Sequence, residues 1–339
     1  MNHRRNTSQI GAALVTLVVA AACSDVNRTP TEPAMSPNAE SPSFSRSPDG
    51  MEVLRAAHVH TTVEGAQRAR FSRFHRSNDL SYHGGVGGIG VETAPRAYVV
   101  FWGSQWNNND PSGEAATVQS FLNGVGGSSW LNSVTQYCQA VSSGTVYCNG
   151  AGAAAGNTTG ILVGVWFDNG GAAPSHPSQS NLASEAVRAA AHFGNTSASS
   201  NASAQYVIAT SHGNSSSGFG TQYCGYHSST SSSYGNVAYT NLPYMTDAGA
   251  SCGANFNGLG SNAGITIVEG HELAETISDQ FPNGGWLDGS GAENGDKCAW
   301  ISSGQGASAR VTLSTGSYPV QSLWSNAFNS GSGGCVLSY

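Results

Sequence analysis

Three dense runs of apolar and β-branched residues in the middle of the chain predict buried strands. They are Ala97–Trp102, Gly160–Phe167 and Ala204–Thr210, and each has the length and composition of a strand. Apolar residues recur at helical spacing within Gln179–Phe193 and within Glu114–Leu122. Strands separated by helices in this way predict an α/β or α+β fold, a single domain with a central sheet flanked by helices.

A Gly-rich joint, Gly84–Gly90, separates this patterned part from what precedes it. Residues 24–50 are rich in Pro, Ser, Asn and Thr and are nearly free of apolar side chains, so they cannot bury enough surface to fold. The basic stretch Arg68–Arg76 fits a helix, a pro-segment or more linker. We therefore expect residues 23–83 to be a disordered linker and residues 84–339 to be one globular domain.

The N-terminus has the three parts of a secretory signal. Two arginines come first, Ile10–Ala22 is uncharged and mostly apolar, and small residues end this stretch before Cys23. Residues 1–22 are therefore interpreted as a signal peptide, because the stretch is too short for a mature membrane helix. The small-residue run that ends in cysteine also resembles a bacterial lipobox, which would place a lipid anchor on Cys23. The alternatives are an envelope lipoprotein, held at the membrane only by that anchor, and a secreted protein.

The cysteines and the charge agree with export. Beyond position 84 the chain has four basic and thirteen acidic residues, which argues against nucleic acid and anionic membrane surfaces as partners. We expect a monomer. The six cysteines after Cys23 predict three disulfides. Sequence alone leaves fifteen pairings open, of which the nearest-neighbour choice is Cys138–Cys148, Cys224–Cys252 and Cys298–Cys335.

The segment most informative about chemistry is Thr266–Asp279, which predicts a helix near the C-terminal third of the chain. One face is apolar and the other carries His271, Glu272 and Glu275, with His271 and Glu275 one above the other at i and i+4. Carboxylates this close repel one another unless a cation lies among them, and a divalent metal ion would serve. The motif H-E-x-x-E differs from the zinc-protease motif H-E-x-x-H in its second metal ligand, and a carboxylate is an accepted zinc ligand.

A third metal ligand would come from a loop downstream. Glu293 and Asp296 lie 18 and 21 residues beyond Glu275, and one large group of zinc enzymes has an acid at about that distance. His212 and His227 are further candidates. Which of these residues binds is left open by the sequence.

The leading hypothesis is a zinc-dependent hydrolase that acts on a peptide or a cell-envelope polymer. Glu272 would be the general base that takes a proton from the metal-bound water. A solvated helix face without metal is the plain alternative.

A second function class is a non-catalytic extracellular or cell-envelope binding protein. Calcium would then be held by oxygen ligands in the loop Asp288–Asp296. Carbohydrate would be recognised through aromatic side chains, although such residues more often lie in a core. The tryptophans in question are Trp102, Trp106, Trp286 and Trp300.

Several motifs occur together in one order. H-E-L-A-E at His271–Glu275 is followed by Trp286 and by E-x-x-D-x-C at Glu293–Cys298. This order resembles the signature of the EXORDIUM, or phosphate-induced protein 1, family of plant extracellular proteins and their bacterial relatives. Phe101–Trp106, Ser129–Trp130 with Tyr137, and Cys224–His227 resemble further family elements, whereas the family's glycine-rich stretch is replaced by Ala299–Gln305. The resemblance implies an extracellular protein of the family's fold, in growth or cell-wall contexts, more than it implies an enzyme.

Overall fold

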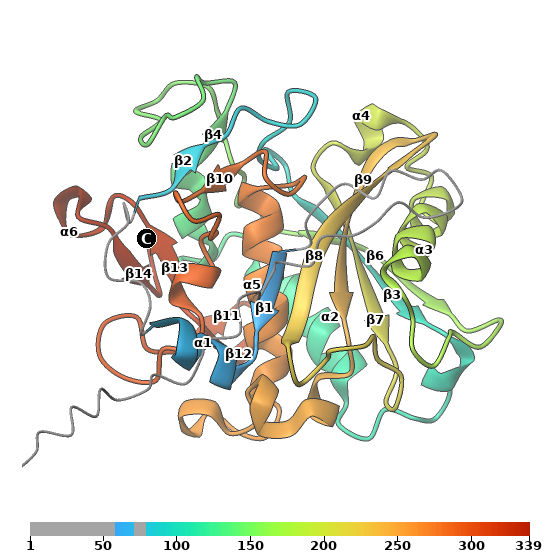
Figure 1. The fold of residues 1–339 in the computed structure, drawn as a ribbon. Coiled ribbons are helices and arrows are strands. Elements are labelled where there is room, and N and C mark those ends of the chain that lie inside the picture. Colours follow the sequence, from blue (N-terminus) through green and yellow to red (C-terminus); the bar gives the residue numbers. More distant parts are fainter. Residues whose placement is uncertain (1–57, 71–78) are drawn as a thin grey trace, which may run out of the picture. The chain divides into compact units, whose positions relative to one another are not determined.

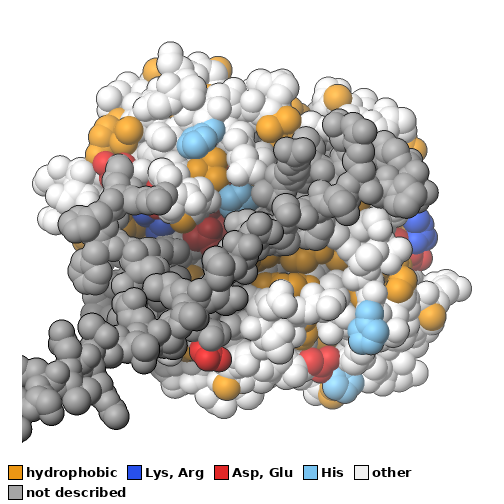
Figure 2. Space-filling view, viewed as in Figure 1, with side chains coloured by type: hydrophobic (Ala, Val, Ile, Leu, Met, Phe, Trp, Pro, Cys, Tyr) orange, Lys and Arg blue, Asp and Glu red, His pale blue; other side chains and the backbone are white. Residues whose placement is uncertain are grey.

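The computed structural model describes residues 58–70 and 79–339, with the backbone alone for residues 68–70. The expected signal peptide, the lipobox cysteine and the linker up to residue 57 lie outside the described residues. Within the described residues, no helix is long and apolar enough to cross a membrane. Most side chains visible in Figure 2 are uncharged, in keeping with the sparse charge of the sequence.

A six-stranded mixed sheet forms the centre of the fold (Figure 1). The three apolar runs predicted as strands are confirmed as β3 (Arg96–Trp102), β6 (Leu162–Asp168) and β7 (Ala204–Thr210). β3 pairs in parallel with both β6 and β7, as expected for strands joined through helices. The strand order is β1-β8-β9-β7-β3-β6. The other three strands are β1 (His58–Thr61), β8 (Tyr223–Ser232) and β9 (Gly235–Leu242).

Helices cover both faces of this sheet, which confirms the predicted α/β class. On one face α3 (Gln179–His192) and the short α4 (Ala198–Asn201) pack on β7 and β9. On the other face α2 (Glu114–Val125) and α5 (Ala263–Ser278) share a larger buried cluster with the sheet. The three helices predicted from apolar periodicity are therefore α2, α3 and α5.

Smaller elements surround α5 and support the loops beside it. Within the described residues these are four two-stranded sheets, two short helices and five 3-10 helices. The sheets pair β2 (Ser81–Tyr82) with β10 (Trp286–Leu287), β4 (Cys138–Gln139) with β5 (Ala153–Ala154), β11 (Ala309–Leu313) with β12 (Gly316–Val320), and β13 (Leu323–Ser325) with β14 (Gly334–Val336). The helices are α1 (Val63–Arg70), α6 (Phe328–Gly331), η1 (Ser104–Trp106), η2 (Leu131–Gln136), η3 (Met245–Cys252), η4 (Phe256–Gly258) and η5 (Asp296–Cys298).

Three disulfides join these elements, and their pairing confirms the nearest-neighbour choice. Cys138 bonds Cys148 in the segment around β4. The other two bonds lie nearer α5: Cys224–Cys252 ties β8 to η3, and Cys298–Cys335 ties η5 to β14. Three disulfides are typical of a protein that folds in an oxidising, extracytoplasmic compartment.

β1 and α1 lie before the joint at Gly84, in the stretch that the sequence assigned to a linker. β1 pairs antiparallel with β8, with His58 opposite His227. Side chains two apart in a strand share one face, so His58 and His60 lie on the same side of β1. The segment therefore contributes a strand to the central sheet, which the expected boundary did not include.

Candidate metal centre

Helix α5 runs through the interior, and all sixteen of its residues are buried. Apolar side chains such as Ile267 and Leu273 belong to the core. His271, Glu272 and Glu275 have no exposed surface either. The interpretation of these residues as a solvated helix face is therefore wrong. Burying three ionisable side chains on one helix is unfavourable unless something compensates their charge.

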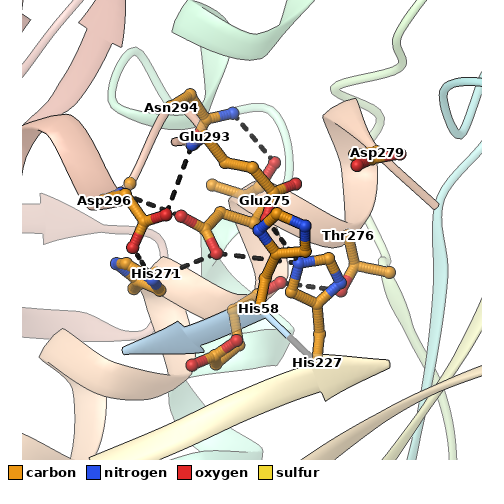
Figure 3. A network of polar contacts seen from close by, with 12 residues as sticks. His58, His227, His271, Glu275, Thr276, Asp279, Glu293, Asn294 and Asp296 are labelled. Atoms are coloured by element: carbon orange, nitrogen blue, oxygen red, sulfur yellow. Dashed lines mark hydrogen bonds and ion pairs between the residues drawn. The ribbon is translucent and has the colours of Figure 1, made fainter. Parts of the chain in front are cut away.

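The loop after β10 returns to α5 and brings a third candidate ligand to His271 and Glu275 (Figure 3). His271 Nε2 lies 3.1 Å from Glu275 Oε2 and 3.9 Å from Asp296 Oδ1. The backbone amide of Asp296 donates to Glu275 Oε1 over 2.8 Å, which fixes the loop on the helix. One ligand atom from each of the three residues lies within 4.8 Å of the others. His271, Glu275 and Asp296 could therefore hold a metal ion.

Neighbouring groups orient His271 for that role. Its Nδ1 lies 3.3 Å from Gln321 Oε1, and Gln321 Nε2 donates to the Gly295 carbonyl over 2.7 Å. A proton on Nδ1, donated to Gln321, leaves the Nε2 lone pair available for a cation. Burial also lowers the pKa of His271, which favours the neutral ring. Position 295 requires glycine, because a Cβ there would lie 2.6 Å from His271 Nδ1 and 2.9 Å from Glu275 Oε1.

A second group of side chains adjoins the first. His227, from β8, places Nε2 2.8 Å from Glu293 Oε2 and 3.7 Å from Glu275 Oε2. His227, Glu272 and Glu275 also offer ligand atoms within 4.8 Å of one another. Glu275 is thus common to both groups, while Glu293, the other expected third ligand, is paired with histidine. His227 was a further candidate from the sequence, and the structure brings it to the site.

Two histidines that the sequence analysis did not single out complete the arrangement. His58 Nδ1 lies 2.8 Å from Glu293 Oε2. The ring of His60 stacks on that of His271, with centroids 3.9 Å apart and planes inclined by 7°. An H-x-H pair in a strand presents both side chains to one face, and this spacing was the signal that could have identified them.

Burial and mutual repulsion govern ionisation at the site. Burial, reinforced by Glu275, raises the pKa of Glu272 well above its usual range, and burial, reinforced by Glu293, does the same for Glu275. Burial and then Glu275 raise the pKa of Asp296 to about 7. Burial opposes the ionisation of Glu293, but two adjacent histidines outweigh it and hold the pKa of Glu293 below its usual range. A divalent cation among these groups would convert the repulsion into attraction.

Several atoms of the ligand type are buried without a hydrogen-bond partner. They are His271 Nε2, both carboxylate oxygens of Glu272 and Glu275 Oε2. Buried polar atoms are nearly always hydrogen-bonded, and a metal ion could supply the partner that these atoms lack. Ligand atoms ~2.1 Å from a tetrahedral ion lie ~3.4 Å apart. The 3.1 Å and 3.9 Å separations from His271 Nε2 to Glu275 and to Asp296 bracket that value.

Other residues considered from the sequence have other surroundings. His212 is half-exposed and pairs with Asp247. Asp288, in the loop considered for calcium, lies 2.9 Å from Lys297 Nζ, so an ammonium group already balances its charge. Three of the four tryptophans considered as a platform for sugar rings are buried in the core, namely Trp106, Trp286 and Trp300.

Comparison of the chain with family models, with curated proteins and with solved structures finds no match. The resemblance to the EXORDIUM family stays a prediction. The structure adds buried histidine and carboxylate groups that could hold a metal ion.

Proposed function

We propose that the chain is a zinc-dependent hydrolase of the peptidase type, with His271, Glu275 and Asp296 as the metal ligands. The observation that carries the proposal is the convergence of their ligand atoms, with His271 Nε2 and Glu275 Oε2 buried 3.1 Å apart and neither making a hydrogen bond. The imidazole favours zinc, because calcium prefers a shell of oxygen ligands. Three protein ligands leave a fourth position open for water, as a catalytic zinc site requires.

Glu272 is suited to be the general base. Zinc in such a site would lower the pKa of a bound water and polarise a carbonyl group. Glu272 follows His271 directly on α5, and both of its carboxylate oxygens lack a partner. A cation nearby would favour the ionised form of Glu272, which is the form that accepts a proton from water.

The substrate would be met outside the cytoplasm. The three disulfides favour that location, and the N-terminal signal predicted from the sequence agrees with it. We propose an extracellular peptide or a cell-envelope polymer as substrate, for a protein that is either secreted or anchored at Cys23. The EXORDIUM resemblance belongs to the same proposal, since it implies an extracellular address.

The test compares Glu272→Gln with Glu269→Gln in the zinc-loaded full chain. Glu269 lies on the same helix and is equally buried and unpartnered, but it belongs to none of the groups that could hold a metal ion. Glu272→Gln should keep its zinc and lose turnover by about a hundredfold to ten-thousandfold on a mixed peptide library followed by mass spectrometry. Glu269→Gln should keep both its zinc and its turnover.

Equal turnover in Glu272→Gln and the wild type would contradict the assignment of the base. If neither the zinc-loaded wild type nor variants with alanine in place of His60, or of both His58 and His60, hydrolyse any peptide, a non-catalytic binding protein becomes the better account.

A further inference from the structure

Strand β1 lies along the edge of β8 and against the candidate metal centre (Figure 1). We propose that this edge of β8 binds an extended peptide substrate, and that β1 occupies the place of that peptide and blocks it. The inference rests on the proposed hydrolase function and deepens it. It names the substrate class and assigns β1 as a built-in inhibitor of the same site.

β1 pairs with β8 as a peptide ligand would. The pairing is antiparallel, with Val59 opposite Tyr226 and His60 opposite Gly225. Among the strands that the structure describes, β1 neighbours β8 alone, so β8 would be the edge of the described sheet once β1 left. Exposed sheet edges bind extended peptides through main-chain hydrogen bonds, which accept many side chains.

The pairing register of β1 and β8 places one residue of β8 beside the proposed base, Glu272. Gly225 is the β8 residue opposite His60. A Cβ on Gly225 would lie 3.2 Å from Glu272 Oε1, so the strand and the carboxylate are in close approach. A peptide in the position of β1 would therefore present its backbone next to Glu272.

The side chain of His60 fills the space that a substrate carbonyl and a water would need. Its ring lies between those of His271 and Trp300, with centroids 3.9 Å and 4.8 Å away. His60, His271 and Glu272 offer ring-nitrogen and carboxylate atoms within 4.8 Å of one another. The His60 imidazole thus lies beside both the proposed ligand His271 and the proposed base Glu272, where a catalytic site needs an open position.

Three of the four ring nitrogens of the β1 histidines make no hydrogen bond. Neither ring nitrogen of His60 has a hydrogen-bond partner, although the residue has no exposed surface. Nε2 of His58 is likewise unpartnered. Unmade hydrogen bonds on buried groups cost free energy, and releasing the strand to water would recover it. β1 is therefore suited to leave.

The experiment measures access to zinc and binding of a strand, both in the full chain. Wild type, His60→Ala and His58→Ala/His60→Ala are loaded with zinc, and dipicolinate then extracts the metal. We expect about one zinc per chain in each, and extraction at least ~tenfold faster in the double variant, which corresponds to ~1.4 kcal/mol of strand docking. A labelled synthetic peptide with the sequence of residues 57–63 should bind the double variant more tightly than the wild type.

Two controls separate blocking from general destabilisation. His83→Ala removes an exposed histidine away from β1 and should behave as the wild type. His60→Phe keeps an aromatic ring against His271, so dipicolinate should extract zinc from this variant slowly. A peptide with both histidines replaced by alanine should bind less well.

Equal extraction rates in all variants, with no binding of the peptide to the double variant, would overturn the inference. So would loss of zinc from His60→Ala, because His60 would then be a permanent ligand. If the double variant does not fold, His60→Ala against His60→Phe decides the question. A wild type that takes up no zinc would contradict the proposed hydrolase, and peptide binding would still decide whether β8 accepts a strand.

Discussion

The two faces of the central sheet bury acidic side chains in different ways. On the α3 face, Glu185 is nearly fully buried and pairs with Arg188 one turn later, and Arg188 also contacts Asp168 over 2.8 Å. On the α5 face, the ion pairs that the structure describes for Glu275 and Glu293 run to histidines. The first arrangement carries the permanent cation of an arginine, whereas the second pairs its carboxylates with histidines, whose charge depends on a proton, and could hold a metal ion.

This difference separates a structural acid from a functional one. A buried carboxylate beside arginine is explained by packing and charge within the chain. Buried carboxylates that face histidine nitrogens are not balanced by a permanent cation of the chain, and they could hold a metal ion. Four changes to the molecule would test whether the acids near α5 differ from Glu185 in this way.

The largest effect is expected from His271→Ala, compared with His192→Ala on α3. His192 stacks on Trp166 with centroids 4.0 Å apart and is remote from the metal centre. Loss of His271 removes the nitrogen ligand of the proposed set, so zinc affinity should fall by more than about a hundredfold, beyond the loss caused by removing an orienting partner. His192→Ala should bind zinc normally. Competition with a chromophoric chelator measures both, and normal affinity in His271→Ala would contradict the ligand assignment.

Gln321→Leu should have the next largest effect. It removes the group that accepts from Nδ1 of His271 and that ties Gly295 to the site. Partners of this kind typically contribute tenfold to a hundredfold to metal affinity. Gln321→Glu keeps an acceptor for Nδ1 and should lose less. The same chelator competition applies, and equal affinities in the wild type and Gln321→Leu would show that the orientation of His271 does not depend on Gln321.

Removing the Cys298–Cys335 disulfide should weaken zinc binding more than removing Cys138–Cys148. Cys298 ends the 3-10 helix that begins at Asp296, so the bond fixes a metal ligand. Sequence separations of 37 and 10 residues predict stabilisation of about 4 and about 3 kcal/mol in the chain-entropy model. Stability alone therefore distinguishes the two bonds poorly. Double Cys→Ser variants, measured for urea unfolding and zinc affinity, should differ mainly in affinity.

The smallest effect on zinc binding is expected at Glu269, which is buried on α5 without a hydrogen-bond partner. Burial raises the pKa of Glu269 from 4.5 to about 8. The folded protein therefore holds a proton that the unfolded chain releases between these values, and the free energy of unfolding falls as pH rises through this window. The slope is at most ~1.4 kcal/mol per pH unit. Glu269→Gln should remove this pH dependence. In the metal-free protein, the unfolding free energy of the variant minus that of the wild type should therefore be larger at pH 8 than at pH 5. An equal difference in unfolding free energy at pH 5 and pH 8 would contradict the raised pKa of Glu269.

Local patterns predicted much of the fold and part of the site. The strands β3, β6 and β7 and the helices α2, α3 and α5 have strong periodicity of their own, and the H-E-x-x-E spacing identified His271 and Glu275. The contribution of β1 could not be predicted, because it depends on pairing with β8 more than 160 residues later. Gln321 gave no signal either, since its role depends on a contact with His271 across 50 residues of chain. The proposal of Asp296 as the third ligand likewise depends on distances in the folded chain.

The most direct test of the account is zinc K-edge X-ray absorption on the full chain loaded with zinc. The account predicts nitrogen and oxygen scatterers at ~2.0–2.2 Å, no sulfur, and an imidazole signature that disappears in His271→Ala. The same zinc spectrum in the wild type and in His271→Ala would contradict the proposed ligand set. So would less than about a tenth of an equivalent of zinc bound to the wild type after loading and desalting, under conditions that retain a single catalytic zinc.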